Sequence, residues 1–413
     1  WKTSETSRFY NTPYLYKDNG FKDRTKAQEL VDYLSDPLPA EGSVTAIERK
    51  KEVKNPPLLF NLAELQNECS KLFKISPDQT LAVVQELYEK KLVTYPRTDA
   101  RVLSSAISKE IDKNIRGLCS YAPLNDIASQ VLEEKSYVNI GKSRYCDDKK
   151  ITDHYAIIPT GQGFGAMRGL SQTASRVYEV IARRFLSIFF PSAEYTKVSV
   201  SLNVKNELLS ASFKVLSKEG YLSVMKNSFA KSQDSEENDE AMLQALKKVK
   251  KGDILSVEEF SIKEGETSPP KRYNSGSIIL AMENAGQLIE DEELRAQIKG
   301  SGIGTSATRA EILKKLNTIG YIATNPKTQI ITPTMLGEIV YDVVDNSIKQ
   351  LLNPELTASW EKGLTYVANG EITSDEYLNK LEGFVTRRTQ AVKSMNNQSE
   401  LVKLFNDFAR FYK

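Results

Sequence analysis

One tyrosine and one arginine lie close together in a segment that could carry out phosphate chemistry. Tyr95 and Arg97 occur in residues 92–99, Leu-Val-Thr-Tyr-Pro-Arg-Thr-Asp, where a β-branched pair and Pro96 favour extended backbone directly after a predicted helix. Two residues apart on an extended chain, the side chains project to the same face. A phenol is a weak nucleophile unless a cation or base is near it. A guanidinium can hold two phosphate oxygens. The segment therefore fits a nucleophile beside a phosphate-binding cation, although a half-buried tyrosine and a surface Arg97–Asp99 ion pair would need no function.

The only histidine of the chain, His154, precedes an apolar run that ends in Pro159 and Thr160. This pattern predicts a buried segment that holds His154 at the edge of a cavity. A cationic imidazole could bind a scissile phosphate, and a neutral one could assist its proton transfers. A lone histidine is more often structural than catalytic, so this alternative stays open.

A glycine- and hydroxyl-rich stretch at residues 300–311 precedes a helix expected from Glu311 to Leu316. Backbone N–H groups in such a stretch can bind a DNA phosphate, but a capped turn between helices would have the same pattern. The stretch lacks the Gly-Lys-Ser/Thr end of a nucleotide-binding P-loop. Residues 320–324 and 329–333 then flank a turn and predict a hairpin behind the helix. This is the outline of a winged helix, which can bind duplex DNA or serve as an interaction or structural module.

Carboxylates do not converge in the sequence in a way that predicts a metal site. Mg²⁺ needs several oxygen ligands at one point, and the chain contains no Asp-X-Asp-X-Asp motif. The acidic run at residues 290–293 falls on a predicted helix, so its members should point around the axis into solvent. The polar tract at residues 231–240 is expected to be a solvated loop without a function.

Composition limits the class of protein only broadly. A chain of 413 residues fits two to four domains, and 56 basic and 54 acidic side chains leave a net charge of +2 that excludes no partner. Cys69, Cys119 and Cys146 lie far apart and read as reduced thiols rather than a disulfide or zinc framework. No apolar stretch is long enough for a membrane span or a signal peptide. Trp1 in place of Met indicates a fragment or a processed chain.

The order of the predicted elements indicates an α+β, multi-domain fold. A helix is expected around residues 26–34, helices from residue 62 to Phe190, and a helix that starts with Ser76 and Pro77 and ends near Lys90. Strands are expected at residues 194–202, 211–215 and 254–262, and the last third is helical. We therefore predict a β-rich domain of residues 1–55 and 194–267, an inserted helical domain of residues 56–193, and a helical domain of residues 268–413.

Residues 92–99 resemble the active-site motif of type IA DNA topoisomerases, closest to the bacterial topoisomerase III branch. Further stretches are similar to family blocks, in the same order along the chain. These are residues 56–62, 65–66, 85–89, 154–160, 269–273, 302–311 and 356–361. Such collinear blocks make coincidence implausible.

The resemblance implies a toroidal fold in which a β-rich arch domain and an inserted helical domain with the tyrosine surround a hole for DNA. Residues 268–413 would be part of the domain that binds the single strand. Tyr95 would attack a phosphodiester of single-stranded DNA to give a 5′-phosphotyrosine, followed by strand passage and religation without ATP. Arg97 would hold the scissile phosphate and His154 would bind or polarise it. The further DNA contacts expected are Thr94, Thr98, Arg101, Thr305, Thr308 and Arg309.

The sequence departs from the family at its start. The family opens with a TOPRIM domain that carries a general-acid glutamate, a lysine and the acidic Mg²⁺ motif, and this sequence contains none of them. The resemblance therefore implies Mg²⁺ in a TOPRIM domain in cis, with no metal held by this chain, and an isolated chain that is inactive or nearly so. The expected partner is a single-stranded segment of an underwound duplex. A monomer in the bacterial cytoplasm, associated with the nucleoid or a mobile element, is expected.

Two other classes of protein remain as alternatives to an enzyme of this family. A non-catalytic DNA-binding module would use the winged-helix-like segment and a basic groove. A tyrosine recombinase or a replication-initiator nuclease would need several arginine and histidine residues or a histidine metal cluster, and a single histidine argues against both.

Overall fold

The computed structural model describes residues 1–230, 244–285 and 302–412. The polar tract at 231–240, the acidic run at 290–293, and Gly300 and Ser301 lie outside the described residues. Within them, helices and strands form a mixed α/β chain of two compact units. One unit is Trp1–Pro57 with Ser187–Pro270, and the other is Leu58–Leu186 with Lys271–Lys413.

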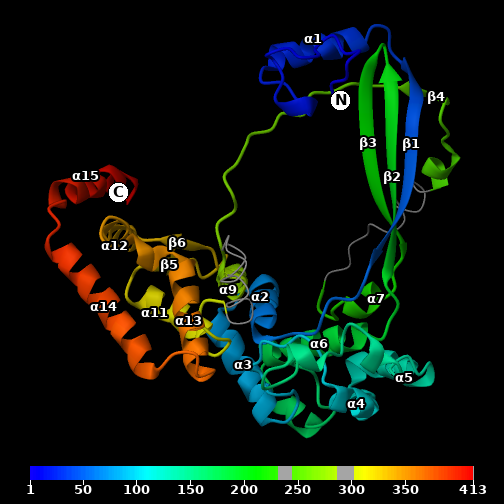
Figure 1. Cartoon of the computed structure of the whole chain (residues 1–413). Helices are drawn as coiled ribbons and strands as arrows, with labels where there is room; N and C mark the ends of the chain where they lie inside the picture. The colour runs from blue at the N-terminus through cyan, green and yellow to red at the C-terminus, as the bar shows by residue number, and fades with distance from the viewer. Residues whose placement is uncertain (231–243, 286–301, 413) are drawn as a thin grey trace. The chain divides into compact units, whose positions relative to one another are not determined.

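The first unit is built on a four-stranded sheet with the order β3-β2-β1-β4, in which all neighbours are antiparallel (Figure 1). Its strands are β1 (Ala40–Lys54), β2 (Ala193–Val204), β3 (Glu207–Lys218) and β4 (Ile254–Val257). The alternation that predicted β2 and β3 is confirmed. The strand expected at 254–262 stops at Val257, earlier than the sequence suggested.

Helix α1 (Arg24–Leu34) closes one end of this unit, where a helix was expected. The Asp23 carboxylate accepts a hydrogen bond from the Thr25 N–H at 2.6 Å and so satisfies a donor of the first turn. Leu30 and Leu34 of this helix are buried together with Phe9 and with Val204 of the sheet. This unit also contains the short helix α7 (Leu222–Met225).

The second unit begins with a block of helices between residues 58 and 187. These are α2 (Leu62–Phe73), α3 (Pro77–Glu89), α4 (Ser105–Leu118), α5 (Asn125–Glu133) and α6 (Gln172–Ser187). Helix α3 starts as the sequence predicted, since Ser76 and Gln79 form a reciprocal capping box and Pro77 occupies the first turn. Its last residue, Glu89, is followed by Lys90 as the C-cap, which confirms the predicted end.

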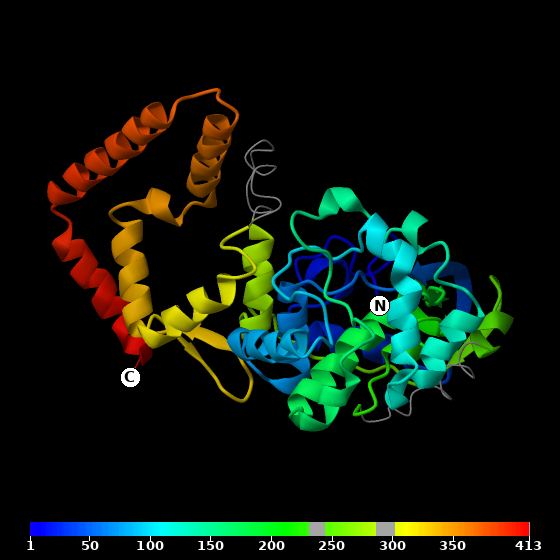
Figure 2. The ribbon, with the colours of Figure 1, turned by 90° about the horizontal axis from the view of Figure 1, so that it is seen from below.

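The remainder of the second unit is helical apart from one hairpin, and Figure 2 shows it running to the C-terminus in colours from yellow-green to red. The helices are α9 (Ser275–Glu283), α11 (Arg309–Thr318), α12 (Met335–Asp345), α13 (Pro354–Ala368), α14 (Ser374–Lys393) and α15 (Gln398–Ala409). The predicted hairpin is confirmed as β5 (Ile322–Thr324) and β6 (Ile331–Pro333). Gly337 of α12 is required there, because a Cβ would lie 1.9 Å from the Tyr321 carbonyl oxygen.

Short 3₁₀ turns connect several of these elements. They are Lys17–Asn19, Ala122–Leu124, Ile140–Lys142, Asp148–Lys150, Phe164–Gly169, Lys349–Leu352 and Arg410–Tyr412.

One shared core joins the two stretches of sequence that form the second unit. Ala63 of α2, Ile279 and Met282 of α9, and Leu313 of α11 are buried against one another. Burying such side chains stabilises the fold by about 1.5–3 kcal/mol each. The core therefore fixes helix α9, from the last third of the chain, on the helical block that contains Tyr95. The three cysteines are free thiols. Among the described helices none has both the length and the apolar character to cross a bilayer.

Candidate active site

Tyr95 lies outside the helices and strands, a few residues beyond the end of α3, as the sequence predicted for its position after that helix. Lys91 adopts a left-handed conformation, with φ of +60°, and turns the chain away from the helix. Val93 is buried and forms an isolated antiparallel bridge with Pro159. The Thr94 N–H donates to the Ile158 carbonyl at 3.0 Å. These contacts fix the tyrosine segment on the segment that follows His154.

Two threonines, one on each side of Tyr95 in the sequence, bind the backbone of residues 154–158, the histidine segment, through their hydroxyls. The Thr94 hydroxyl donates to the Ala156 carbonyl at 3.0 Å and accepts from the Ile158 N–H at 2.9 Å. The Thr98 hydroxyl donates to the His154 carbonyl at 2.7 Å. The centroids of the Tyr95 and His154 rings are consequently only 4.4 Å apart, although the two residues are far apart in sequence.

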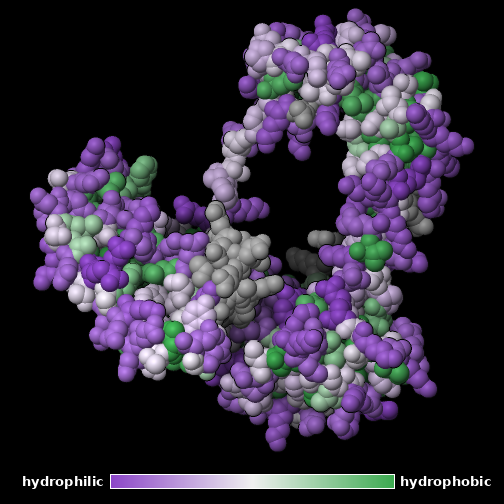
Figure 3. All heavy atoms as spheres, in the orientation of Figure 1, coloured by the Kyte–Doolittle hydropathy of each residue, from purple (hydrophilic) through white to green (hydrophobic). Residues whose placement is uncertain are grey.

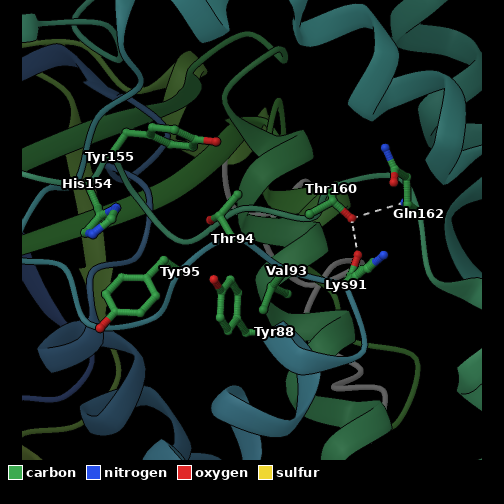
Figure 4. A pocket seen from close by; sticks show the side chains of 9 residues that line it. All are labelled: Tyr88, Lys91, Val93, Thr94, Tyr95, His154, Tyr155, Thr160 and Gln162. Carbon is green, nitrogen blue, oxygen red and sulfur yellow. Dashed lines mark hydrogen bonds between the residues drawn. The ribbon is translucent and has the colours of Figure 1, made fainter.

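A cavity of about 360 Å³ opens at this pair of rings (Figure 4). Its lining consists of Tyr88, Lys91, Val93, Thr94, Tyr95, His154, Tyr155, Thr160 and Gln162. Tyr88, from the last turn of α3, meets the Tyr95 ring edge to face at 5.5 Å. Within the described part of the chain the Tyr95 hydroxyl has no hydrogen-bond partner, and the residue is half-buried. The Tyr95 ring is thus held by neighbouring rings, while its hydroxyl oxygen is free to contact a ligand.

Sequence reasoning did not assign Lys91, Tyr155, Thr160 or Gln162 to the site. The Thr160 hydroxyl donates to the Lys91 carbonyl at 2.5 Å and accepts from the Gln162 N–H at 3.1 Å, so this end of the cavity is closed by a polar turn (Figure 4). Burial raises the pKa of the Tyr155 phenol, which keeps that hydroxyl protonated and able to donate. Two further tyrosines, Tyr88 and Tyr155, occur near the predicted nucleophile and next to the predicted histidine. Their aromatic side chains could have indicated that they line the same site.

Arg97 is exposed and does not line the cavity. Across the described residues it makes no ion pair or side-chain hydrogen bond, so its guanidinium is available to a ligand. The surface pair between Arg97 and Asp99, the alternative left open by the sequence, is not formed. Asp99 instead pairs with Arg309 at 3.0 Å.

A charged network around Arg309 connects the tyrosine block to α9 and α11. Arg309 is 1% exposed, and its Nε donates to the Ile303 carbonyl at 3.2 Å while Nη1 donates to Asp99. The Asn61 amide donates to the Asp99 carbonyl at 3.1 Å and to the Glu283 carboxylate at 2.6 Å. The network holds the end of the Tyr95 segment through Asp99.

The other residues expected to contact DNA are in different situations. Arg101 pairs with Glu64 at 2.6 Å, and Thr305 and Thr308 are exposed at the start of α11 with their hydroxyls 3.2 Å apart. DNA contact by these residues, and by the half-buried Thr94, stays a prediction. Thr98 and Arg309 are 4% and 1% exposed and use their polar groups internally, which argues against direct contact. For these two residues the internal hydrogen bonds favour a role in positioning the site over the expected contact with DNA.

In its described part, the glycine-rich stretch packs closely against helix α9. Gly302 has φ of +59°, and a Cβ there would lie 2.3 Å from the Met282 carbonyl oxygen of α9. The Ile303 N–H donates to the same carbonyl at 2.8 Å. This observation favours the turn alternative for Gly302 and Ile303, while the hydroxyls of Thr305 and Thr308 remain on the surface.

The partly buried carboxyl of Glu283 is expected to make the stability of this network dependent on pH. Burial raises the pKa of Glu283, with the charge of Arg309 acting in the opposite direction. A carboxyl whose pKa is raised in the folded chain stabilises the fold below the ordinary glutamate pKa and loses that contribution as pH rises through the raised value. We expect Glu283→Gln to flatten this dependence, which urea midpoints between mildly acidic and neutral pH would measure. Replacing Glu311, an exposed carboxyl of α11, by glutamine should leave the profile unchanged, and an unaltered profile for Glu283→Gln would contradict the assignment.

Comparison with known proteins identifies the family. The family model described as DNA topoisomerase matches residues 3–379. DNA topoisomerase 3 of Bacillus licheniformis is 34% identical over 381 residues, 91% of this chain and 50% of that protein, and that of Bacillus subtilis is 34% identical over 383 residues with the same coverage. The chain thus spans about half the length of these curated relatives. Full-length topoisomerase I from Thermotoga maritima has the same fold, with a TM-score of 0.62 and 23% identity over 90% of this chain and 55% of that one. The chain belongs to the type IA DNA topoisomerase family and is similar to its topoisomerase III members.

Proposed function

We propose that this chain carries the strand-cleaving tyrosine of a type IA topoisomerase and that Tyr95 is this nucleophile. The observation that supports the proposal most directly is the open Tyr95 hydroxyl at a cavity of about 360 Å³, with the His154 ring 4.4 Å from the tyrosine ring. A tyrosine that only filled the core would be enclosed and hydrogen-bonded. The substrate is single-stranded DNA within an underwound duplex.

The proposed reaction exchanges one phosphate ester for another. The Tyr95 oxygen forms a bond to phosphorus, the bond from phosphorus to the 3′ oxygen breaks, the phenol gives up its proton, and the leaving 3′ oxygen takes one. The product is a 5′-phosphotyrosine and a free 3′-hydroxyl. Because one ester replaces another, the bond energy is retained and religation needs no ATP. Passage of a second strand through the break relaxes or decatenates the DNA.

Arg97 and His154 have distinct roles in this proposal. Arg97, a cation left without a protein partner among the described residues, holds the scissile phosphate from the exposed side of the tyrosine segment. His154, which is exposed at the cavity edge, binds or polarises the same phosphate. Thr94, Thr305, Thr308 and Arg101 contact the adjoining DNA backbone.

We also propose that the chain has the domain organisation of the family. The β-rich unit is the arch domain, residues 56–193 are the active-site domain, and residues 268–413 are part of the single-strand-binding domain. The antiparallel sheet of the first unit and the helices around Tyr95 support this assignment. The protein acts as a monomer at the bacterial nucleoid or on a mobile element.

The described residues of this chain do not form a site for the Mg²⁺ ion that the family requires. No group of three or more histidine, cysteine, aspartate or glutamate side chains among them could hold a metal ion. We therefore assign the metal and the general acid to a TOPRIM domain, and the steps attributed to this chain are binding, orientation and attack by Tyr95.

We expect the 413-residue chain on its own not to relax supercoiled DNA, because the described residues that line the Tyr95 cavity include no carboxylic acid and no group of metal ligands. The same chain rebuilt with a TOPRIM domain should relax it with Mg²⁺ and without ATP. Agarose-gel topoisomer ladders would compare the two proteins, and gel shift with a single-stranded oligonucleotide would show that the shorter one still binds. Full relaxation by the 413-residue chain alone would contradict the assignment of the metal and the general acid to a TOPRIM domain.

A further inference from the structure

A second cavity lies on the C-terminal helices, between α13 and α14. It has a volume of about 500 Å³ and is lined by Trp360, Glu376, Asn379, Lys380, Phe384 and Arg387. An indole, a phenyl ring, an amide and two cationic side chains thus share one hollow. None of these residues belongs to the Tyr95 cavity, and the proposed cleavage reaction uses none of them.

The aromatic wall of this cavity is held in place by edge-to-face contacts. The Trp360 ring meets Tyr377 at 5.6 Å and Phe384 at 5.8 Å between ring centroids. Gly363 makes room for this packing, because a Cβ there would lie 2.8 Å from the Tyr377 ring. Trp360 is only partly buried, so part of its indole remains accessible in the cavity. The ring is therefore fixed before any ligand arrives.

The charge at the cavity is positive. The only acidic residue of its lining, Glu376, is paired with Lys380 at 2.9 Å. Arg387 is exposed and, among the described residues, has neither an ion pair nor a side-chain hydrogen bond. Arg388 adds a second guanidinium 5.6 Å from the Phe384 ring. The face of the C-terminal helices seen in Figure 3 is mostly hydrophilic around these elements. Such a surface suits an anionic ligand better than an apolar partner helix.

A nucleotide combines the features that this lining would recognise. Its base has a π-face that stacks on an indole, its edge can hydrogen-bond an amide such as Asn379, and its phosphate attracts an unpaired guanidinium. Stacked aromatic rings beside cations are how proteins hold single strands without reading their sequence. A duplex would not offer an unstacked base to Trp360.

We propose that the cavity between α13 and α14 is a stacking subsite for one nucleotide of a single-stranded DNA segment, with Trp360 under the base and Arg387 on the phosphate. This inference rests on the proposed action on single-stranded DNA. It adds a second binding site for the strand, separate from the residues that carry out cleavage.

The chain offers a direct spectroscopic test, because it contains two tryptophans. In a Trp1→Phe background Trp360 is the sole indole reporter. A fluorescein-labelled thymidine oligonucleotide of about ten residues reports binding by anisotropy, and an unlabelled copy reports stacking through Trp360 emission. An abasic strand with the same number of phosphates separates base stacking from charge attraction. Arg387→Gln probes the phosphate contact, and Lys393→Gln, an exposed cation on the same helix, is the matched control.

Saturating thymidine oligonucleotide should quench Trp360 emission, and the abasic strand should quench it far less. Arg387→Gln should weaken binding about three- to tenfold while Lys393→Gln leaves it near the parent value. Trp360→Leu should cost about tenfold, with circular dichroism to confirm folding. Unchanged emission at saturated anisotropy, or equal quenching by both strands, would overturn the subsite while leaving the cleavage proposal standing. No anisotropy change at all would contradict action on single-stranded DNA itself, and the subsite with it.

Discussion

Tyr95→Phe should abolish covalent attachment to single-stranded DNA in the chain rebuilt with a TOPRIM domain, a loss of about 10⁴-fold or more. The substitution removes one oxygen and keeps the ring, so the contacts with His154 at 4.4 Å and Tyr88 at 5.5 Å are retained. Without the phenolic oxygen no ester to phosphorus can form. Denaturing gels of an oligonucleotide labelled on the 3′ side of the break would show the protein–DNA adduct in the parent and none in the variant.

Tyr88→Phe is the matched control, because Tyr88 lines the same cavity and loses the same atom. We expect this variant to keep most of the adduct, and Tyr95→Phe to keep binding of the strand. Adduct formation that survives in Tyr95→Phe would assign the nucleophile to another residue. If the rebuilt parent binds DNA but never forms an adduct, the alternative of a non-catalytic DNA-binding module is favoured instead.

Arg309→Ala should destabilise the second unit by about 3 kcal/mol. Arg309 is 1% exposed, and its removal leaves the exposed Asp99 without its ion pair and the partly buried Glu283 without a nearby cation. An unpaired charge that stays buried costs far more than a surface pair contributes. Equilibrium unfolding in urea, followed by circular dichroism, would measure the change in free energy of unfolding.

Two further arginine substitutions serve as controls for the predicted loss of stability in Arg309→Ala. Arg97→Ala removes an exposed guanidinium that has no partner in the described part of the chain, and it should change stability by less than about 0.5 kcal/mol. Arg309→Lys keeps the charge but loses the planar fork that reaches both Asp99 and Ile303, so an intermediate loss is expected. Equal stability of Arg309→Ala and the parent would show that the network does not hold the unit together.

The elements next to the site were predictable because their signals are local. The start of α3 could be read from Ser76 and Pro77, and its end from the β-branched residues and Pro96 beyond it. Strand β1 was missed because residues 48–54 are almost all charged and lack the alternation of a half-buried strand. What makes β1 a strand is its antiparallel backbone pairing with β2 from Ser43 to Lys54, which no local pattern in the sequence shows.

Two residues of the candidate site were predictable from the sequence, but the contacts that hold them were not. Tyr95 and His154 were found by residue type, and the structure brings their rings together. Arg309 was expected to contact DNA, and only the folding of α11 against the tyrosine block buries it beside Asp99. Contacts between residues so distant in sequence depend on tertiary packing, and spacing along the chain does not encode them.

The two hydroxyls on either side of Tyr95 have a further consequence. Because Thr94 and Thr98 both donate to the backbone of the histidine segment, phenol and imidazole are parts of one small rigid piece. If the proposed strand passage takes place, the motion that opens a path for a second DNA strand is expected to carry both rings together. The broken end would then travel with its histidine, and resealing could begin without the two groups having to find each other again.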